Sequence, residues 1–256
     1  MFKEELYLHP LQHNVESALK ELLKFEEEIL LYYREFDEKF RRPDLLGKTV
    51  MVTDKQFSEI YAITAEVATI MEISAPTVYV YEDFYYGVEC KGIDNPWIEI
   101  SAKTITDLSL NEVRFLLARE FCRLKHGSVY LDTLANQTMK IVQESSMLPG
   151  MDMLAKTLKV KYCKWSRVSH YSADCLGYLV VKDLEACCQA VLKLVLNNLQ
   201  LAKQVDIKSY IGQTEMINEL DDSVSRFTKN DERIPYGPFR LKHLITYASS
   251  INVINQ

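Results

Sequence analysis

The chain has 256 residues and a mass of 29.7 kDa, which is enough for one sizeable core. Its net charge of −6, with no basic stripe, argues against nucleic acid or an anionic membrane as a partner. No apolar run approaches the ~20 residues that a membrane span needs, and charged residues lie where a secretory signal would be apolar. The six cysteines include no C-x-x-C pair, which favours reduced, buried thiols and a cytoplasmic location.

The first hundred residues predict a long helix followed by a small sheet. Apolar residues recur at helical spacing over residues 11–42, and Pro43 is expected to end this helix. Asp54 is the predicted N-cap of a second helix at 55–73. The alternation of β-branched, aromatic and polar residues predicts three strands, at 48–53, 77–81 and 97–101.

The rest of the chain is predicted to be helical. Ser109 and Glu112 form a capping-box pattern that begins a helix running to about Tyr130. Further helices are expected at 131–147, 151–163, 165–181, 183–203, 207–229 and after Pro238. The sequence therefore predicts an α+β fold that is mostly helical, with a small three-stranded sheet, in one domain over residues 1–256.

The segment around Glu120 has the spacing of a metallopeptidase zinc helix without its metal ligands. In an H-E-x-x-H helix, histidines at i and i+4 bind Zn²⁺ and the glutamate is the general base. Here Arg119 and Arg123 stand at the histidine positions, and only Glu120 remains. A guanidinium has no lone pair to give a metal, so the pattern predicts the helix without its chemistry.

Other motifs along the chain resemble one known family over roughly residues 9 to 250. They are His9-Pro10, Val52-Thr-x-x-Gln-Phe-x-x-x-Tyr61, Pro76-Thr-Val-Tyr-Val80, Trp165-Ser166-Arg167, Tyr171-Ser172-Ala173-Asp174 and Pro238-Phe239-Arg240. In this order they are similar to the HtpX-like zinc metallopeptidases of the gluzincin type, in particular their soluble bacterial members. The resemblance implies a zincin-like fold, a third zinc ligand that is a glutamate, and peptide-bond hydrolysis.

The same resemblance shows where this chain departs from the family. It places the third ligand at His170, so Arg119, Arg123 and His170 are vestigial ligand positions and Glu120 is a vestigial base position. It assigns Asp174 and Arg240 to the residues that support the ligands, and Ile234-Pro235 stands where the family has His-Pro. Zinc is the family's cofactor, but we predict no metal and no other cofactor here.

Several local readings stay open at the level of sequence. Arg119 and Arg123 either pair with Glu120, Asp174 or both, replacing the charge of the metal, or lie on a solvated helix face. Cys122 and His126 have the i, i+4 spacing of a metal-binding pair, although Cys122 is expected to face the core. His170 alone is also typical of a polar core residue. In the segment 85–86, two tyrosines either line a substrate groove or pack.

The sequence leaves three alternative functions. The first is a catalytically inactive metallopeptidase homologue that keeps the peptide-binding groove and binds a peptide or protein partner. The alternative is an active hydrolase with an unorthodox site around Glu120, Cys122 and His170, including a Cys122–His170 thiol–imidazole pair. The third is a structural subunit. The amphipathic N-terminal helix suits packing on the body of the protein or against another copy of the chain.

Overall fold

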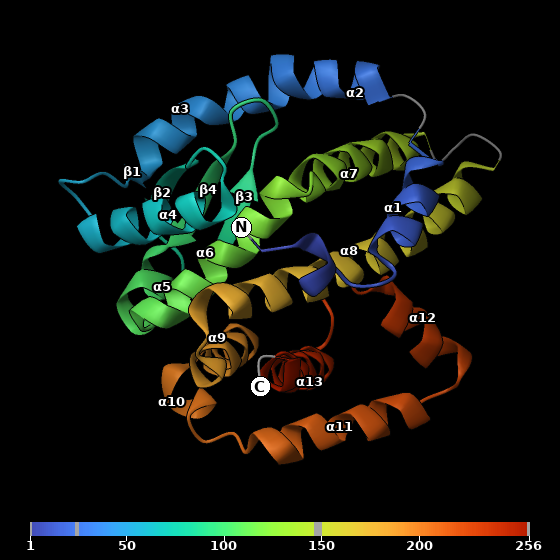
Figure 1. The fold of residues 1–256 in the computed structure, drawn as a ribbon. Helices are drawn as coiled ribbons and strands as arrows, with labels where there is room; N and C mark the ends of the chain where they lie inside the picture. The colour runs from blue at the N-terminus through green and yellow to red at the C-terminus, as the bar shows by residue number, and fades with distance from the viewer. Residues whose placement is uncertain (1, 24–25, 146–149, 255–256) are drawn as a thin grey trace.

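The computed structural model describes residues 2–23, 26–145 and 150–254, and it is a mostly helical α+β structure (Figure 1). The helices are α1 (Gln12–Lys20), α2 (Glu26–Tyr32), α3 (Glu38–Lys48), α4 (Ser58–Met71), α5 (Ala102–Asp107), α6 (Leu110–Lys125), α7 (Ser128–Glu144), α8 (Met151–Val181), α9 (Leu184–Leu196), α10 (Leu199–Ala202), α11 (Ile207–Glu219), α12 (Ser223–Asp231) and α13 (Gly237–Ile254). A 3-10 turn η1 (Glu4–Leu6) precedes α1, and a π-helical turn η2 (Tyr33–Asp37) joins α2 to α3. The strands are β1 (Val50–Met51), β2 (Thr77–Tyr81), β3 (Val88–Lys91) and β4 (Trp97–Ser101).

The sheet has four strands in the order β1-β2-β4-β3, so the prediction of three strands was wrong by one. β2 and β4 are parallel, while β1 and β3 pair antiparallel with β2 and β4 respectively. The strand missing from the prediction is β3, which lies at an edge within the turn-rich segment. Its four residues alternate apolar and charged side chains over too short a span to stand out from the turns around it.

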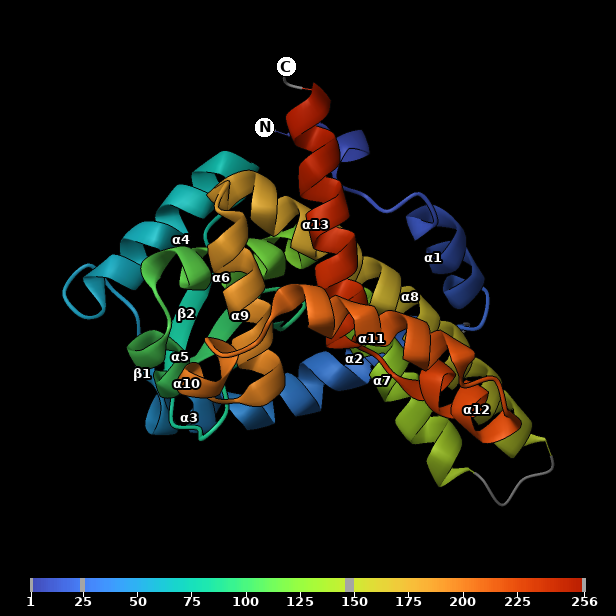
Figure 2. The ribbon, with the colours of Figure 1, turned by 90° about the horizontal axis from the view of Figure 1, so that it is seen from below.

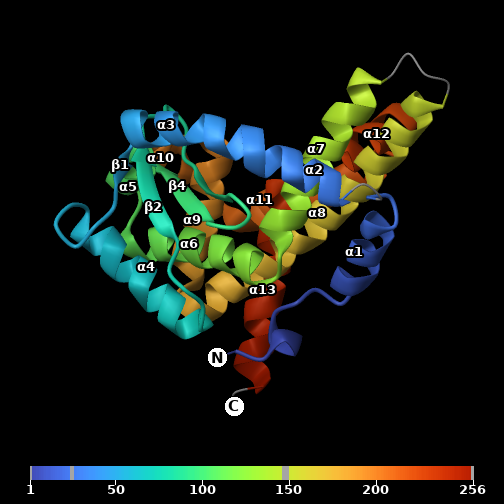
Figure 3. The same ribbon diagram turned by 90° about the horizontal axis from the view of Figure 1, so that it is seen from above.

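The two faces of the sheet are covered differently. Ile98 and Ile100 of β4 are fully buried in the core that the sheet shares with α4 and α6. Glu99 points to the opposite face, where it accepts hydrogen bonds from Arg41 of α3, from Lys91 of β3 and from the indole of Trp97. Figures 1 and 3 show α3 on this face and α4 and α6 on the other.

The N-terminal tract is not one helix over 11–42, and Pro43 does not end it. α1 stops at Lys20, the tract continues as α2, η2 and α3 to Lys48, and Pro43 lies inside α3. Residues 24 and 25 of the predicted helix lie outside the described part of the chain. Pro43 removes one backbone hydrogen bond, but Pro43 and Lys39 are both exposed, so water can replace the partner that the Lys39 carbonyl loses.

Several predicted boundaries also differ. The capping box of Ser109 and Glu112 is confirmed, but α6 ends at Lys125 because Gly127 adopts a left-handed conformation with φ 65°. Asp54 is not the N-cap of α4; Phe57 is, in a left-handed conformation. Within the range 48–53 that was predicted as a strand, only the two residues of β1 form one. The helix predicted at 131–147 begins earlier, as α7, and its last two residues lie outside the described residues.

α8 is a single helix of 31 residues where two were predicted, and it organises the rest of the molecule. It packs against α6, α7, α1 and α13. Figure 2 shows α13 crossing α8 on the side away from the sheet, with α9 and α11 beside it. The predicted helices at 183–203 and 207–229 are each two helices, because Asn198 and Asp222 cap new helices with their side chains. No helix in the described ranges has the length and apolar character needed to cross a membrane.

Candidate functional site

The candidate residues meet inside the protein, between α6, α8 and α13. Arg119, Glu120 and Arg123 come from α6, His170 and Asp174 from α8, and Arg240 from the first turns of α13. All six side chains are buried; Asp174 is 0% exposed and Arg119 is 5% exposed. The reading in which the two arginines lie on a solvated helix face is therefore wrong.

Helical spacing explains why these side chains converge. Positions 119 and 123 share one face of α6, and positions 170 and 174 share one face of α8, because residues four apart lie one turn above each other. The two helices approach closely at Gly177, where an added Cβ would lie 2.6 Å from the ring of Phe115 and 3.1 Å from Cγ of Arg119. The absent side chain at Gly177 leaves room for Arg119 to extend toward α8.

Asp174 is held by two guanidinium groups. Arg119 Nε lies 2.5 Å from its Oδ1, and Arg240 donates from Nε to Oδ2 at 2.9 Å and from Nη2 to Oδ1 at 2.8 Å. Burial alone raises the pKa of this carboxyl, but the charges of Arg240 and Arg119 outweigh it and bring the pKa below its ordinary value. Asp174 is therefore an ionised carboxylate whose charge is fully compensated.

His170 is a neutral hydrogen-bond acceptor. Its Nδ1 lies 3.0 Å from Nη2 of Arg119, and because a guanidinium can only donate, Nδ1 must accept and the ring proton must be on Nε2. Burial, followed by the nearby charges of Arg123 and Arg119, lowers the pKa of His170 well below its ordinary value. His170 is thus fixed in one tautomer by an arginine.

Glu120, which the sequence pattern places at the position of a general base, has both a charge partner and a backbone partner. Arg123 donates from Nη1 to Oε2 at 2.7 Å, and the backbone N–H of Cys90 in β3 donates to the same oxygen at 3.0 Å. Burial lowers the pKa of Arg123, but the carboxylates of Glu120 and Asp132 outweigh it and raise that pKa above its ordinary value. The predicted pairing of both arginines with Glu120 and Asp174 is therefore present.

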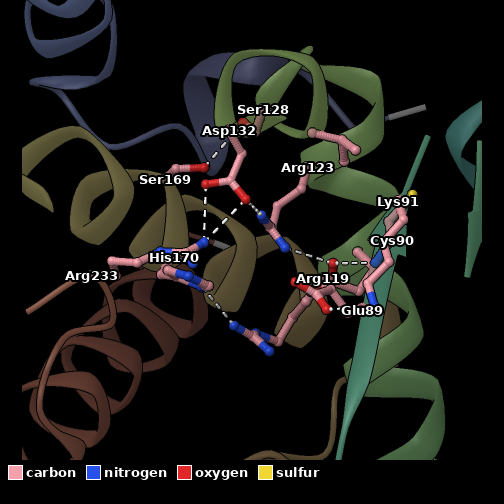
Figure 4. Close-up of polar contacts among 12 residues, drawn as sticks. Glu89, Cys90, Lys91, Arg119, Arg123, Ser128, Asp132, Ser169, His170 and Arg233 are labelled. Carbon is pink, nitrogen blue, oxygen red and sulfur yellow. Dashed lines mark hydrogen bonds and ion pairs between the residues drawn. The ribbon is translucent and has the colours of Figure 1, made fainter. Parts of the chain in front are cut away.

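The site includes residues that the sequence did not indicate (Figure 4). Asp132 of α7 lies 3.4 Å from Nη2 of Arg123, and it also accepts from Arg233, at 3.0 and 3.1 Å, and from the hydroxyl of Tyr162. Arg233 immediately precedes Ile234-Pro235, so that altered loop was the one signal in the sequence that pointed to it. Figure 4 shows Asp132 between Arg123 and Arg233.

The residues present do not fit a zinc ion. Two of the three predicted ligand positions hold guanidinium groups, which have no lone pair, and both nearby carboxylates, Glu120 and Asp174, are engaged by arginines. Within the described residues, no group of three or more His, Cys, Asp or Glu side chains could hold a metal. The buried carboxylates of Asp174 and Glu120 are instead balanced by the guanidiniums of Arg119, Arg240 and Arg123.

The remaining candidates lie apart from this arrangement. Cys122 faces the hydrophobic core, and burial raises the pKa of its thiol, so it lacks the thiolate that a nucleophile needs. His126 Nε2 is 2.8 Å from the hydroxyl of Tyr7 at the N-terminal segment. In the pair 85–86, Tyr86 is packed and donates to Asp107 at 2.7 Å, whereas Tyr85 is exposed.

Comparison with known proteins supports a distant relation to a metallopeptidase. No family model matches the chain, and no solved structure matches it. The chain is 26% identical over 183 residues to plastoglobule-localized metallopeptidase 48, chloroplastic, of Arabidopsis thaliana. The match covers 70% of this chain and 52% of that protein, so the chain spans about half the length of this curated relative. Distant similarity to a metallopeptidase thus accompanies a site in which arginines stand where the sequence pattern predicts metal ligands.

Proposed function

We propose that this chain is a catalytically inactive relative of the metallopeptidases and that it acts by binding a peptide or protein partner. The observation that carries the proposal is the pairing of Arg119 with Asp174 and of Arg123 with Glu120. A zinc hydrolase makes its nucleophile from metal-bound water, and the glutamate must be free to take the proton. Here the guanidiniums supply positive charge without an open coordination position, and Glu120 is hydrogen-bonded to Arg123 and to β3.

The binding surface that we propose is the outer edge of β3. Ser101 N–H donates to the Gly87 carbonyl at 2.9 Å, so residue 87, and by alternation residues 89 and 91, direct their backbone groups toward β4. Val88 and Cys90 therefore direct their backbone N–H and C=O groups away from β4, toward the outer edge. Since Cys90 N–H is used by Glu120, Val88 offers the outward N–H to an extended peptide, as in recognition by strand addition.

Exposed aromatic residues beside this edge support the proposal. Phe84 is 82% exposed and Tyr85 is 66% exposed, and they lie in the loop that leads into β3. Aromatic side chains are enriched where proteins bind one another. The alternative, a hydrolase using Glu120, Cys122 and His170, has less support, because Cys122 is a core thiol and His170 already accepts from Arg119. The cytoplasmic location stays a prediction.

Metal content and peptidase activity test the inactive state. We expect protein purified without chelators to carry far less than one zinc per chain by elemental analysis, because the donor set cannot bind it. We also expect no cleavage of casein or of a mixed peptide substrate, with or without added zinc. Close to one tightly bound zinc per chain, or cleavage that a chelator abolishes, would contradict the proposal.

Peptide binding is tested separately. A displayed library of random 12-residue peptides selects ligands, whose affinity is then measured by calorimetry. Val88→Pro removes the outward N–H at an edge, where proline is tolerated, and should weaken binding at least about tenfold, as should Phe84→Ala with Tyr85→Ala. The control is Phe227→Ala on α12, which replaces an aromatic of similar exposure away from β3. Ligands that bind all variants equally would exclude β3 as the surface.

A further inference from the structure

Residues 2–11 cross the body of the protein before α1 begins, and we call them the N-terminal strap. Near its start the ring of Tyr7 is buried in the core, and its hydroxyl lies 2.8 Å from Nε2 of His126 at the end of α6. Further along, the backbone N–H of His9 donates to the hydroxyl of Ser172 on α8 at 2.9 Å. Figures 2 and 3 show the strap beside α13, so it bridges α6, α8 and α13.

Three aromatic rings meet where the N-terminal strap reaches α13. The ring of His9 stacks on Tyr171 of α8, with the centroids 5.9 Å apart, and on His243 of α13, with the centroids 5.7 Å apart. The rings of Tyr171 and His243 are themselves 4.6 Å apart, and Nδ1 of His243 lies 3.8 Å from Sγ of Cys175. Two histidine rings that lie against each other therefore hold the strap to α13.

The hydrogen bonding of His9 requires a neutral ring. The backbone N–H of Leu11 lies 3.2 Å from Nδ1 of His9, and because a backbone N–H can only donate, Nδ1 must carry no proton. A proton on Nδ1 would replace the acceptor with a donor and break this bond. His126 differs, because the Tyr7 hydroxyl can either donate to or accept from its Nε2, and Glu4 Oε1 lies 4.0 Å from its Nδ1. The contact at the Tyr7 end of the strap therefore survives protonation.

A proton on either ring of the His9–His243 pair has no free counter-charge beside it. Among the residues that the structure describes, no carboxylate oxygen lies within 4.0 Å of a ring nitrogen of these two histidines. Asp174 of α8 faces His243, but it is bonded to Arg119 of α6 and to Arg240 of α13. Two guanidiniums thus oppose one carboxylate, and these surroundings favour neutral imidazoles.

The other titratable groups around the pair are uncharged. Burial raises the pKa of the Tyr171 hydroxyl to about 12 and also raises the pKa of the Cys175 thiol, so both keep their protons at neutral pH and below. Burial lowers the pKa of His9, and burial followed by the charge of His9 lowers the pKa of His243, while Asp174 acts in the opposite direction. The closed strap therefore refuses protons that an exposed imidazole, with a pKa of ~6.5, takes up.

We propose that the N-terminal strap is a pH-sensitive closure, which opens at its His9 end when His9 and His243 are protonated. Two imidazolium rings 5.7 Å apart repel each other, and the Leu11 N–H loses its acceptor. Above pH ~6.5 both rings are neutral whether the strap is closed or open, so opening does not depend on pH. As the pH falls below that value, the open strap takes up protons that the closed strap refuses. Each histidine can then favour opening by up to about tenfold per pH unit.

Opening of the strap is expected to reach the side chains that surround Asp174. His243 lies one turn after Arg240 on α13, and Arg240 donates two hydrogen bonds to Asp174. The closed strap ties this turn of α13 to α8 through His9 and Ser172, and an open strap leaves it without that tie. The closure is independent of the proposed function, because it involves neither β3 nor a metal site.

Hydrogen exchange measured by mass spectrometry tests the closure, because the N–H groups of His9 and Leu11 are bonded within the protein while the strap is closed. We expect the protection of peptides from residues 2–11, corrected for the intrinsic exchange rate, to fall at least about tenfold between pH ~6.5 and ~5. Peptides from α6 should stay more strongly protected, since the opening is local. His9→Phe with His243→Phe keeps the ring contacts but cannot be protonated, so its strap should stay protected. His13→Phe, at an exposed histidine of α1, is the matched control and should open like the wild type.

Two results of the exchange experiment would overturn the proposal. One is a wild-type strap that stays protected at pH ~5, or that exchanges only together with α6. The other is a double variant that opens as the wild type does. Circular dichroism melts establish that each variant is folded.

Nuclear magnetic resonance of the wild-type chain keeps the test decisive if the double variant does not fold. We expect the ring protons of His9 and His243 to titrate with apparent pKa values below ~6.5, and the amide resonance of Leu11 to shift in step with them. His13 should titrate without any change at Leu11. If His9 and His243 titrate at ~6.5 or above, or if the Leu11 amide does not respond, protonation does not open the strap and the proposal is wrong.

Discussion

Asp174 has no exposed surface and two guanidinium partners, so its negative charge is compensated inside the protein. A buried carboxylate without a counter-charge is costly, so Asp174 requires a cation beside it. Arg119 supplies that cation from α6, and Arg240 supplies a second from α13. The cluster fixes the geometry of these side chains and adds little net stability, because burying ions is itself costly.

Removal of one arginine should expose that cost. Arg119→Ala leaves Asp174 with one partner, and Arg123→Ala leaves Glu120 buried with only the Cys90 N–H. We expect each variant to lower the free energy of unfolding by about 3–5 kcal/mol, as for other broken buried pairs. Denaturant melts measure the change. Arg226→Ala, at an exposed pair with Asp221, is the control and should be nearly neutral. Two near-neutral core variants would show that the buried pairs are dispensable.

His170 should make stability depend on pH. Above pH ~6.5 the imidazole is neutral in both the folded and the unfolded chain. As the pH falls below that value, the unfolded chain takes up a proton that the folded chain refuses, because the folded pKa is lowered, and stability is lost. His170→Gln should therefore reduce the slope of unfolding free energy between pH 6.5 and 5 by up to about 1.4 kcal/mol per pH unit. The exposed His13→Gln is the control, and equal slopes in all three proteins would argue against a buried neutral His170.

At the scale of elements, the contact between α6 and α8 determines which side chains can meet. Gly177 is a point of close approach, since an added Cβ would overlap the Phe115 ring. Phe115 in turn lies beside Arg119, whose guanidinium carbon is 5.9 Å from the ring centroid. A side chain at position 177 would hold α6 and α8 further apart and would move Asp174 and His170 away from Arg119. The small size of Gly177 therefore supports the cluster.

Gly177→Ala should therefore destabilise the protein, although alanine favours helix over glycine by up to about 1 kcal/mol. The overlap at 2.6 Å is with a ring that is itself fully buried and cannot move freely. Gly212→Ala is the control, because Gly212 lies in α11 with no atom within 4 Å of the added Cβ. We expect the control to raise the melting temperature and Gly177→Ala to lower it. A gain at both positions would show that α6 and α8 can separate without cost.

Local sequence signals identified some elements and missed others for physical reasons. The strands at 77–81 and 97–101 and the Ser109 capping box were predicted because strong periodicity or a side-chain cap marks them. The α4 start was missed because Phe57 takes a left-handed conformation that no local rule gives to an aromatic residue. β3 was missed because four alternating residues are stabilised by pairing with β4 and not by their own propensity.

At the scale of the molecule, the site joins segments that are distant in sequence. Cys90, Glu120, Asp174 and Arg240 come from β3, α6, α8 and α13, and periodicity cannot place one element beside another. The family resemblance singled out Glu120, Asp174 and Arg240 because their motifs occur in the expected order. It did not indicate Asp132 or Arg233. Asp132 accepts from Arg123, Tyr162 and Arg233, and these contacts depend on how α7 and the segment before α13 pack.

The relative placement of α6 and α8 can be tested by building metal ligands onto the two helices. The change Arg119→His, Arg123→His and His170→Glu places two imidazoles one turn apart on α6 and a carboxylate facing them from α8, a ligand set that suits zinc. Positions 119 and 170 are already in contact, since Arg119 Nη2 and His170 Nδ1 are 3.0 Å apart. Oδ1 of Asp174, no longer bonded to Arg119, could accept from an imidazole and orient it.

We therefore expect the triple variant to bind zinc at a ratio of one per chain, measured by elemental analysis after dialysis, and to melt at a higher temperature with zinc than without. The control keeps the two histidines but carries His170→Gln, which removes the carboxylate ligand and should bind zinc far more weakly. Zinc binding is the criterion, because the resemblance expects His-Pro where this chain has Ile234-Pro235, and a catalytic site loose by ~1 Å fails. If a well-folded triple variant takes up no zinc, these positions do not form a metal-binding geometry. The arginine cluster then does not stand in the place of a zinc site.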